Sequence, residues 1–175
     1  MVALLRPASK RPLRGPDFAG LMAMFDANYK RLGWLCPRRG AAFRSRADGS
    51  PDLFMEITGR HAYTTELRLT YYFAAGQGAQ ADPDARLRIY YDARQAEIMS
   101  CRPGMSFRRL HGPWVPSAQE LQRRWTINRF LSKWLDYLLY QGHAMDTFRP
   151  VNALPEHEEW RKQAGDQVDS RSPSP

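Results

Sequence analysis

The sequence predicts an α+β domain: an N-terminal helix, an antiparallel meander of four to five strands and a long C-terminal helix, with both helices on one face of the sheet. Two patterns predict it. Large apolar residues recur every three or four positions in one stretch near the start and in another near the end, and apolar and polar residues alternate between these stretches. The chain has 175 residues, 43% of them hydrophobic. Such a length is typical of one domain whose core needs no disulfide or metal.

We expect three regions along the chain. Residues 1–15 are rich in Arg and Pro and lack a hydrophobic period, which indicates a flexible basic arm. Residues 16–149 contain the periodic patterns and form the single domain. Residues 150–175 end in DSRSPSP, a composition typical of a disordered tail.

The segment PDFAGLMAMFDANYKRLGWLCP predicts the first helix, over residues 17–34. Asp17 is a suitable N-cap, and Pro37 ends the helix because the residue before a proline disfavours helical geometry. The apolar face consists of Phe18, Leu21, Met22, Phe25, Tyr29 and Leu32.

The central region predicts the strands. YTTELRLTYYF alternates over its whole length, which indicates an antiparallel strand with one buried face. RLRIYY and AEIMSC, joined by the turn DARQ, predict a hairpin. The predicted strands cover residues 53–58, 63–73, 86–91, 96–101 and, as a weak fifth, 105–110. Residues 38–52 and 74–85 are predicted to be loops.

The segment SAQELQRRWTINRFLSKWLDYLLYQG predicts the last helix. It opens on a capping-box pattern, Ser117-x-x-Glu120, and Gly142 follows its last apolar residues as a stop. A core-facing stripe is formed by Ile127, Leu131, Trp134, Leu135 and Leu138. Asn128 lies at the polar edge of this stripe, where we expect a structural hydrogen bond; a ligand contact is the alternative.

The cysteines and the absence of targeting patterns favour the cytoplasm. Cys36 and Cys101 are widely spaced and form no C-x-x-C pair, which is typical of free thiols in a reducing compartment. The N-terminus lacks the apolar region of a signal peptide, and no apolar stretch is long enough to span a membrane.

Four stretches carry a family resemblance: PDFAGLM…NYKRLGWLCP, YTTELRL, LRIYYDARQAEI and INRFLSKWLDYLLYQGH. In this order and spacing, across residues 16–143, they resemble the YqiB-like family of proteobacterial proteins, a domain of unknown function. Tyr63, Thr64 and Asp92 match the family pattern, whereas Tyr91 stands where the family more often has histidine. The resemblance implies a cytoplasmic bacterial protein and supplies no activity, no catalytic residue and no cofactor.

The usual catalytic and metal-binding motifs are missing from the sequence. The four histidines lie at no metal-ligand spacing from one another or from a cysteine. There is no nucleophile elbow, no phosphate-binding loop and no dinucleotide fingerprint. We therefore expect no metal and no cofactor, and the sequence favours a binding protein over an enzyme.

One cluster of residues is a candidate binding site. It combines a guanidinium, an imidazole, hydroxyls and a carboxylate near predicted strand ends, and its members are Arg60, His61, Tyr63, Thr64 and Asp92. Turn formation alone also explains part of this pattern.

The polar face of the predicted sheet is the second candidate, because the net charge is +8 and arginine and tyrosine gather there. Its residues are Arg68, Tyr72, Arg86, Arg88 and Tyr90. We expect a non-catalytic module that binds another protein through this face or through a groove beside the helices. The alternative is an RNA or nucleotide ligand, with arginines on phosphates and tyrosines stacked on bases.

Overall fold

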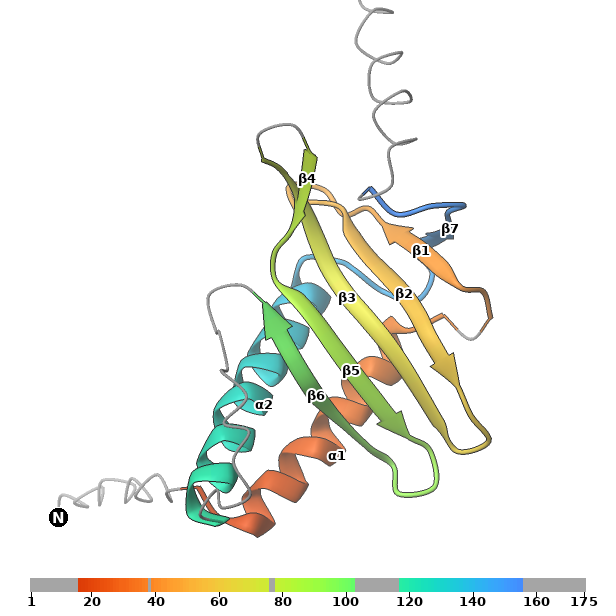
Figure 1. Ribbon diagram of the computed structural model, residues 1–175. Coiled ribbons are helices and arrows are strands. Elements are labelled where there is room, and N and C mark those ends of the chain that lie inside the picture. The colour runs from red at the N-terminus through yellow and green to blue at the C-terminus, as the bar shows by residue number, and fades with distance from the viewer. Residues whose placement is uncertain (1–15, 38, 76–77, 103–116, 156–175) are drawn as a thin grey trace, which may run out of the picture.

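The computed structural model describes residues 16–37, 39–75, 78–102 and 117–155 (Figure 1). The helices are α1 (Phe18–Leu35) and α2 (Ser117–Tyr140). The strands are β1 (Ala42–Ser45), β2 (Leu53–Arg60), β3 (Thr64–Ala75), β4 (Gly78–Ala81), β5 (Asp84–Tyr90), β6 (Gln95–Arg102) and β7 (Phe148–Pro150). The predicted arm, the predicted fifth strand at 105–110 and most of the predicted tail lie outside the described residues.

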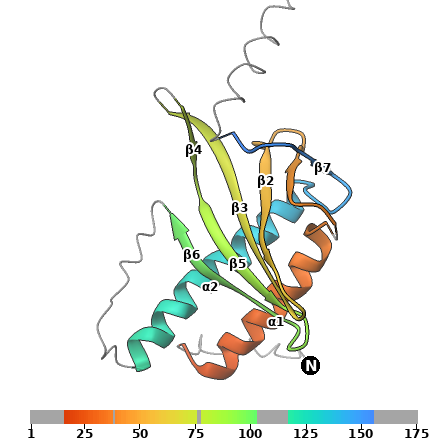
Figure 2. The same ribbon diagram turned by 45° about the vertical axis from the view of Figure 1, so that its right-hand side comes forward.

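The strands form one antiparallel sheet in the order β6-β5-β3-β2-β1-β7, and β4 pairs with the last part of β3. Both helices lie on the same face of this sheet (Figure 2). The predicted α+β class, the meander and the placement of the helices are therefore confirmed. The described part of the sheet has seven strands, however, instead of four to five.

The additional strands are short. β1 and β4 have four residues each and β7 has three, which is too few for an alternating pattern to be recognised. They are strands because a neighbour pairs with them: β1 with β2, β7 with β1, and β4 with β3. The loop predictions are therefore wrong in two places: for residues 38–52 over β1, and for residues 74–85 over β4, the end of β3 and the start of β5.

Helix α1 begins at its predicted cap. The Asp17 carboxylate accepts a hydrogen bond from the backbone N–H of Gly20 at 2.6 Å, which satisfies one of the free donors of the first turn. The helix ends at Leu35, one residue beyond the predicted end and two before Pro37. Its buried residues are Leu21, Phe25, Asn28, Leu32 and Leu35.

Helices α1 and α2 run side by side in the same direction. The Ser132 hydroxyl on α2 donates to the Asn28 side chain on α1 at 2.6 Å. One turn further, the Arg31 guanidinium donates to the Asp136 carboxylate at 2.6 Å. The pairs that set this register are Gly20 with Trp125, Asn28 with Ser132 and Arg31 with Asp136.

The core lies between the helices and the sheet. The predicted stripe of α2 is buried, and the Trp134 ring packs edge-on against the Tyr71 ring of β3 at a centroid distance of 5.9 Å. The facing side chains of the central strands include Leu53, Met55, Leu67, Leu69, Leu87, Ile89 and Ile98. Alternation in the sequence therefore assigned Leu67, Leu69, Leu87 and Ile89 to the buried face correctly.

The C-terminus of α2 turns through a Schellman motif that buries a histidine. The His143 N–H donates to the Leu138 carbonyl at 3.0 Å, and Gly142 supplies the left-handed conformation with φ 91°. The His143 imidazole then lies between two hydroxyls, with Nδ1 2.8 Å from Ser45 Oγ and Nε2 3.2 Å from Ser50 Oγ.

We expect the protein to lose stability as the pH falls from 7 to 5, with a slope of at most about 1.4 kcal/mol per pH unit from His143. Burial lowers the pKa of His143 below its ordinary value, and the nearby Asp52 opposes this only in part. Above the unfolded pKa neither state is protonated. Below it the unfolded chain binds a proton that the folded chain excludes, so unfolding becomes easier. Urea unfolding at pH 7 and pH 5 measures this, and His143→Gln should flatten the dependence.

Candidate functional site

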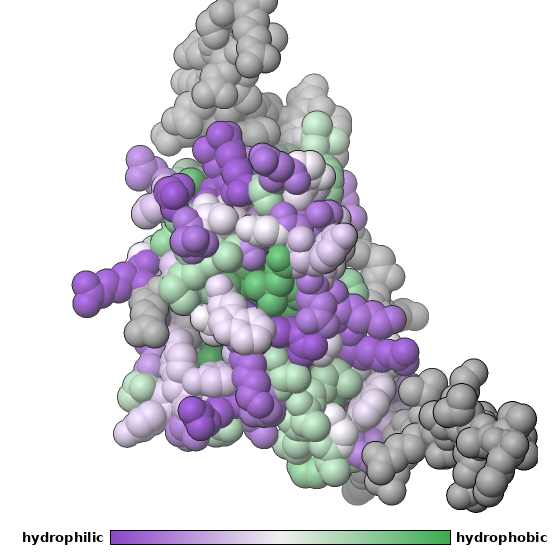
Figure 3. Space-filling view, turned by 180° about the vertical axis from the view of Figure 1, so that it is seen from behind, coloured by the Kyte–Doolittle hydropathy of each residue, from purple (hydrophilic) through white to green (hydrophobic). Residues whose placement is uncertain are grey.

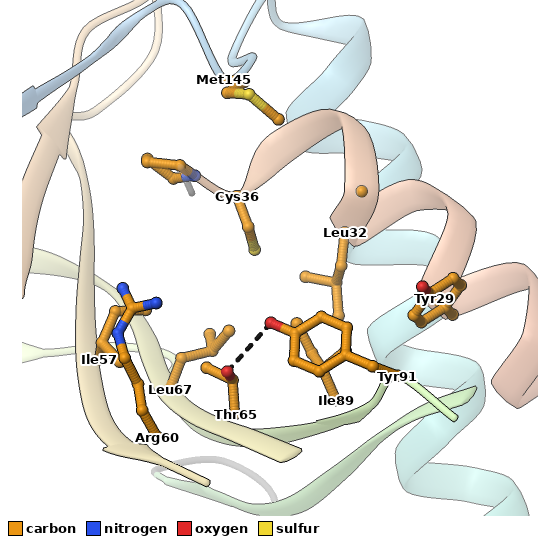
Figure 4. A pocket seen from close by; sticks show the side chains of 12 residues that line it. Tyr29, Leu32, Cys36, Ile57, Arg60, Thr65, Leu67, Ile89, Tyr91 and Met145 are labelled. Carbon is orange, nitrogen blue, oxygen red and sulfur yellow. Dashed lines mark hydrogen bonds between the residues drawn. The ribbon is translucent and has the colours of Figure 1, made fainter. Parts of the chain in front are cut away.

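A pocket opens where the C-terminal half of α1 passes over one end of the sheet. Its volume is about 370 Å³, which lies in the lower part of the range for small-molecule sites. Seen from the side of the helices, apolar side chains are visible in a hollow framed by hydrophilic ones (Figure 3). The pocket is lined by Tyr29, Leu32, Gly33, Cys36, Pro37, Ile57, Arg60, Thr65, Leu67, Ile89, Tyr91 and Met145 (Figure 4).

The floor of the pocket contains a pair of hydroxyls. The Tyr91 hydroxyl donates to Thr65 Oγ1 at 3.0 Å (Figure 4), and Thr65 is only 5% exposed. Tyr91 is the first residue after β5, and its backbone N–H donates to the Tyr63 carbonyl at 2.9 Å. This bond joins the β5–β6 turn to the β2–β3 turn and holds the Tyr91 ring over the end of β3.

Cys36 terminates α1 and points its sulfur into the pocket (Figure 4). The Cys36 N–H donates to the Leu32 carbonyl at 2.8 Å, which fixes the cysteine at the helix end. Burial raises the pKa of the Cys36 thiol to about 12. The thiol is therefore protonated at neutral pH and is a poor nucleophile, because the thiolate is the reactive form.

Arg60 brings a positive charge to the pocket. It is the last residue of β2, and its guanidinium donates to the Gly40 carbonyl at 2.8 Å. Gly40 has φ 109°, and a Cβ there would collide with the Phe43 ring. Only glycine fits this position, so the carbonyl that orients Arg60 is itself fixed by the chain.

The structure brings the predicted turn cluster to this end of the sheet but places only one member in the pocket. His61 and Tyr63 lie in the β2–β3 turn and are exposed, Thr64 begins β3, and Asp92 is exposed in the β5–β6 turn. Of the five, Arg60 alone lines the pocket.

The predicted polar face of the sheet is largely internally paired. Arg68 donates to Asp84 at 2.6 Å, and Arg88 donates to Glu66 at 2.7 Å. A phosphate would have to displace these carboxylates, so the support for an RNA ligand is weaker than the sequence indicates.

The tyrosines of this face are also engaged. The Tyr72 ring is half-buried and packs edge-on against Phe54 at 5.1 Å between centroids. The Tyr90 hydroxyl donates to Glu97 at 3.0 Å. Arg86 is exposed on β5. Both tyrosines therefore already contact other residues of the sheet.

Asn128 makes the structural hydrogen bond expected of it. Its side-chain oxygen accepts a hydrogen bond from the backbone N–H of Ile98 on β6 at 3.1 Å, and its amide donates to the Arg124 carbonyl at 2.9 Å. β6 is an edge strand, so α2 uses this side chain to satisfy a donor that no neighbouring strand reaches. Asn128 does not line the pocket.

Sequence reasoning missed Thr65, Tyr91 and Cys36 as site residues. A signal was present, since Thr65 and Tyr91 both fall on the predicted apolar faces of their strands, where a hydroxyl needs a partner. The signal did not show that the two hydroxyls partner each other, because that depends on the pairing of β3 with β5.

The described residues contain neither a metal-binding cluster nor a membrane-spanning helix. No group of three or more His, Cys, Asp or Glu side chains among them is arranged to hold a metal ion. Neither described helix is both long and apolar enough to cross a membrane.

Comparison with known proteins places the chain in a family. Residues 31–144 match the family described as protein of unknown function (DUF1249). The chain is also 26% identical over 129 residues to the uncharacterized protein YqiB of Escherichia coli K12. This alignment covers 73% of this chain and 91% of that protein. The YqiB proteins of E. coli O6:H1 and O157:H7 match equally well. No solved structure gives a significant match. Because the family match spans more than half of the sequence, including the end of α1 and the strands that line the pocket, the chain belongs to the DUF1249 family.

Proposed function

We propose that this chain is a non-catalytic binding module that holds a small, largely apolar ligand in the pocket between α1 and the sheet. The observation that supports this most is the composition of the pocket wall. Side chains from α1, β2, β3 and β5 converge on one concave surface, and most of them are apolar. A mainly apolar pocket with a few polar groups is the usual form of a small-molecule site.

The chemistry of the lining residues favours binding over catalysis. The described lining residues include no histidine and no carboxylate that could act as a general acid or base. Their thiol, Cys36, is held in its protonated form by burial, which raises its pKa to about 12. Such a pocket can select a ligand but offers little to a reaction.

We also infer that the protein acts in the cytoplasm. Cys36 and Cys101 are both free thiols, which suits a reducing compartment. Burial raises the pKa of Cys101 as well, to about 11, so both thiols resist oxidation as structural cysteines do.

The uncharged dye Nile red tests the pocket. We expect its emission to rise and shift to shorter wavelength on binding, and we expect Gly33→Leu to weaken binding by roughly tenfold or more. Gly33 lines the pocket, and a Cβ on it meets nothing within 4 Å, so leucine should occupy the pocket without disturbing the helix.

Ala23→Leu is the matched control, because Ala23 is exposed on the same helix but does not line the pocket. It should bind the dye as the unmodified protein does. Equal binding by Gly33→Leu and Ala23→Leu would place the dye elsewhere and contradict the proposal.

A protein partner is the second candidate, supported by two exposed aromatic residues. Trp34 is 65% exposed and Tyr140 is 88% exposed. They lie one helical turn beyond Arg31 and Asp136, which form an ion pair between the two helices. Trp34 and Tyr140 are therefore expected on the same outer side of the contact between α1 and α2. Because this chain has a net charge of +8, an acidic protein with an apolar patch fits best. Cross-linking to such a partner should be lost in Trp34→Ala/Tyr140→Ala and kept in Gly33→Leu.

A further inference from the structure

We propose that Ser50 is a nucleophilic serine, with His143 as its general base and the Tyr71 hydroxyl as a further donor, and that it accepts the acyl group of a small ester or thioester. None of these residues lines the pocket between α1 and the sheet, so this reactive site is separate from the proposed binding site. Three observations lead to it: the tautomer of the histidine, the position of the serine and the unpaired hydroxyl of the tyrosine.

A relay of hydroxyls fixes the tautomer of His143. Thr147 Oγ1 lies 2.8 Å from the Ala144 carbonyl, and this contact is attractive only if Thr147 donates, because a carbonyl can only accept. Thr147 has then used its hydrogen, so Ser45 is the donor in their 2.6 Å contact. Ser45 Oγ must therefore accept in its 2.8 Å contact with His143 Nδ1, and Nδ1 carries the proton.

The other ring nitrogen, Nε2, is then free to accept from Ser50. Ser50 Oγ lies 3.2 Å from His143 Nε2, at the outer end of the range over which a general base acts. A proton on Nδ1 and a free Nε2 define the tautomer that takes a proton from a serine. Burial lowers the pKa of His143, and the nearby Asp52 opposes this in part, so the imidazole is neutral at pH 7 and able to accept.

Ser50 lies in a tight turn between β1 and β2. Its N–H donates to the Ala47 carbonyl at 3.2 Å, and Gly49 supplies the left-handed conformation with φ 73°. Ser45 and His143 are fully buried, whereas Ser50 is partly exposed. A reagent can therefore reach the serine hydroxyl while the base behind it remains shielded from water.

The Tyr71 hydroxyl offers a donor for the oxygen that becomes negatively charged. It is buried and has no partner of good hydrogen-bond geometry among the described residues. Burial raises the pKa of Tyr71, and Trp134 and Ser50 lie close enough to lower it in part. An unpaired buried O–H costs stability, and this one lies beside the nucleophile, where it can donate to an oxyanion.

The reaction is an acyl transfer. Ser50 Oγ attacks the carbonyl carbon while its proton passes to His143 Nε2, and the carbonyl oxygen takes the negative charge beside Tyr71. As the tetrahedral species collapses, the bond to the leaving alcohol or thiol breaks, and His143 returns the proton to that group. Ser50 is left as an ester. Because Ser50 is only partly exposed and Tyr71 is buried, a small acyl group fits best.

Two probes test the site. A fluorophosphonate leaves a stable adduct on a reactive serine, and p-nitrophenyl acetate reports acyl transfer by releasing p-nitrophenolate. We expect the fluorophosphonate to modify Ser50 and to leave Ser100, an exposed serine on β6, unmodified, as measured by peptide mass spectrometry. The modified protein should release p-nitrophenolate only as slowly as Ser50→Ala does.

Two variants separate a reactive serine from a structural hydrogen bond. His143→Gln should slow the labelling of Ser50 by about 100-fold or more, with circular dichroism to check its folding. Tyr71→Phe should slow labelling by about 100-fold. It should nevertheless unfold at the same or a higher urea concentration than the unmodified protein, because the hydroxyl that it removes has no partner.

Equal labelling of Ser50 and Ser100 would overturn the proposal. An unchanged rate of labelling in Tyr71→Phe, or in folded His143→Gln, would overturn it as well. Gly33→Leu, which is designed to fill the pocket, should be labelled at the rate of the unmodified protein. Nile red binding and serine labelling are thus measured independently, and the failure of one proposal is distinguishable from the failure of the other.

Discussion

Replacing Leu135 by alanine will lower the free energy of unfolding by about 2–5 kcal/mol. Leu135 is fully buried, at 0% exposure, in the C-terminal half of α2. It belongs to the cluster that also contains Leu67, Leu69 and Leu87 from the central strands. Truncation removes apolar contacts from both layers at once and leaves a cavity that the rigid sheet cannot fill.

Tyr140→Ala, five residues further along the same helix, is the matched control. Its side chain is 88% exposed, and substitutions at such positions usually change stability by less than about 0.5 kcal/mol. Urea unfolding of both variants gives the comparison. If Leu135→Ala is as stable as Tyr140→Ala, the stripe of α2 is not core, and the assignment of this helix to the closing layer fails.

The helices and the long strands could be predicted because their signals are local. The cap of α1 is read from Asp17 and the residues that follow it, and the structure forms that cap. β3 alternates through consecutive residues, so Leu67 and Leu69 are assigned to the core without knowledge of any partner strand. The apolar patterns of the helices and of β3 repeat over several turns or residue pairs, which distinguishes them from a chance match.

The pocket could not be predicted because it depends on register between distant segments. The Thr65 and Tyr91 hydroxyls are 26 positions apart in sequence. They meet because β3 and β5 pair with Thr65 opposite Ile89, two residues before Tyr91. A shift of one residue in this pairing would turn one of the two side chains to the other face of the sheet.

Strand register also explains why the sequence could not show that the arginines of the polar face are paired. The sequence places Arg88 on that face, and the structure agrees, but the residue opposite it is Glu66. Opposite charges that face each other across strands stabilise the sheet, so an arginine that resembles a phosphate contact in the sequence is part of the sheet's own structure. Counting charges on single strands cannot reveal this, because the register decides which charges meet.

Replacing Asn128 by alanine will lower the free energy of unfolding by about 1–3 kcal/mol. Asn128 is at 0% exposure, and its side-chain oxygen is the acceptor for the Ile98 N–H on the edge strand β6. Alanine removes this acceptor while α2 still covers the strand, so the backbone donor is left buried without water. The cost is that of an unsatisfied buried group and not of an average hydrogen bond, which contributes less.

Asn152 supplies the control, since Asn152→Ala makes the same chemical change at an exposed position outside the helices and strands. Hydrogen exchange adds a readout specific to the mechanism: the Ile98 amide should exchange faster in Asn128→Ala relative to amides in the centre of the sheet, such as that of Leu69. A ligand contact would behave in the opposite way, because residues that serve binding can be removed with little loss of stability. Asn128→Ala and Asn152→Ala could instead unfold at the same urea concentration, with the Ile98 amide still protected. In that case the hydrogen bond to β6 does not stabilise the edge of the sheet, and Asn128 is better interpreted as a ligand contact.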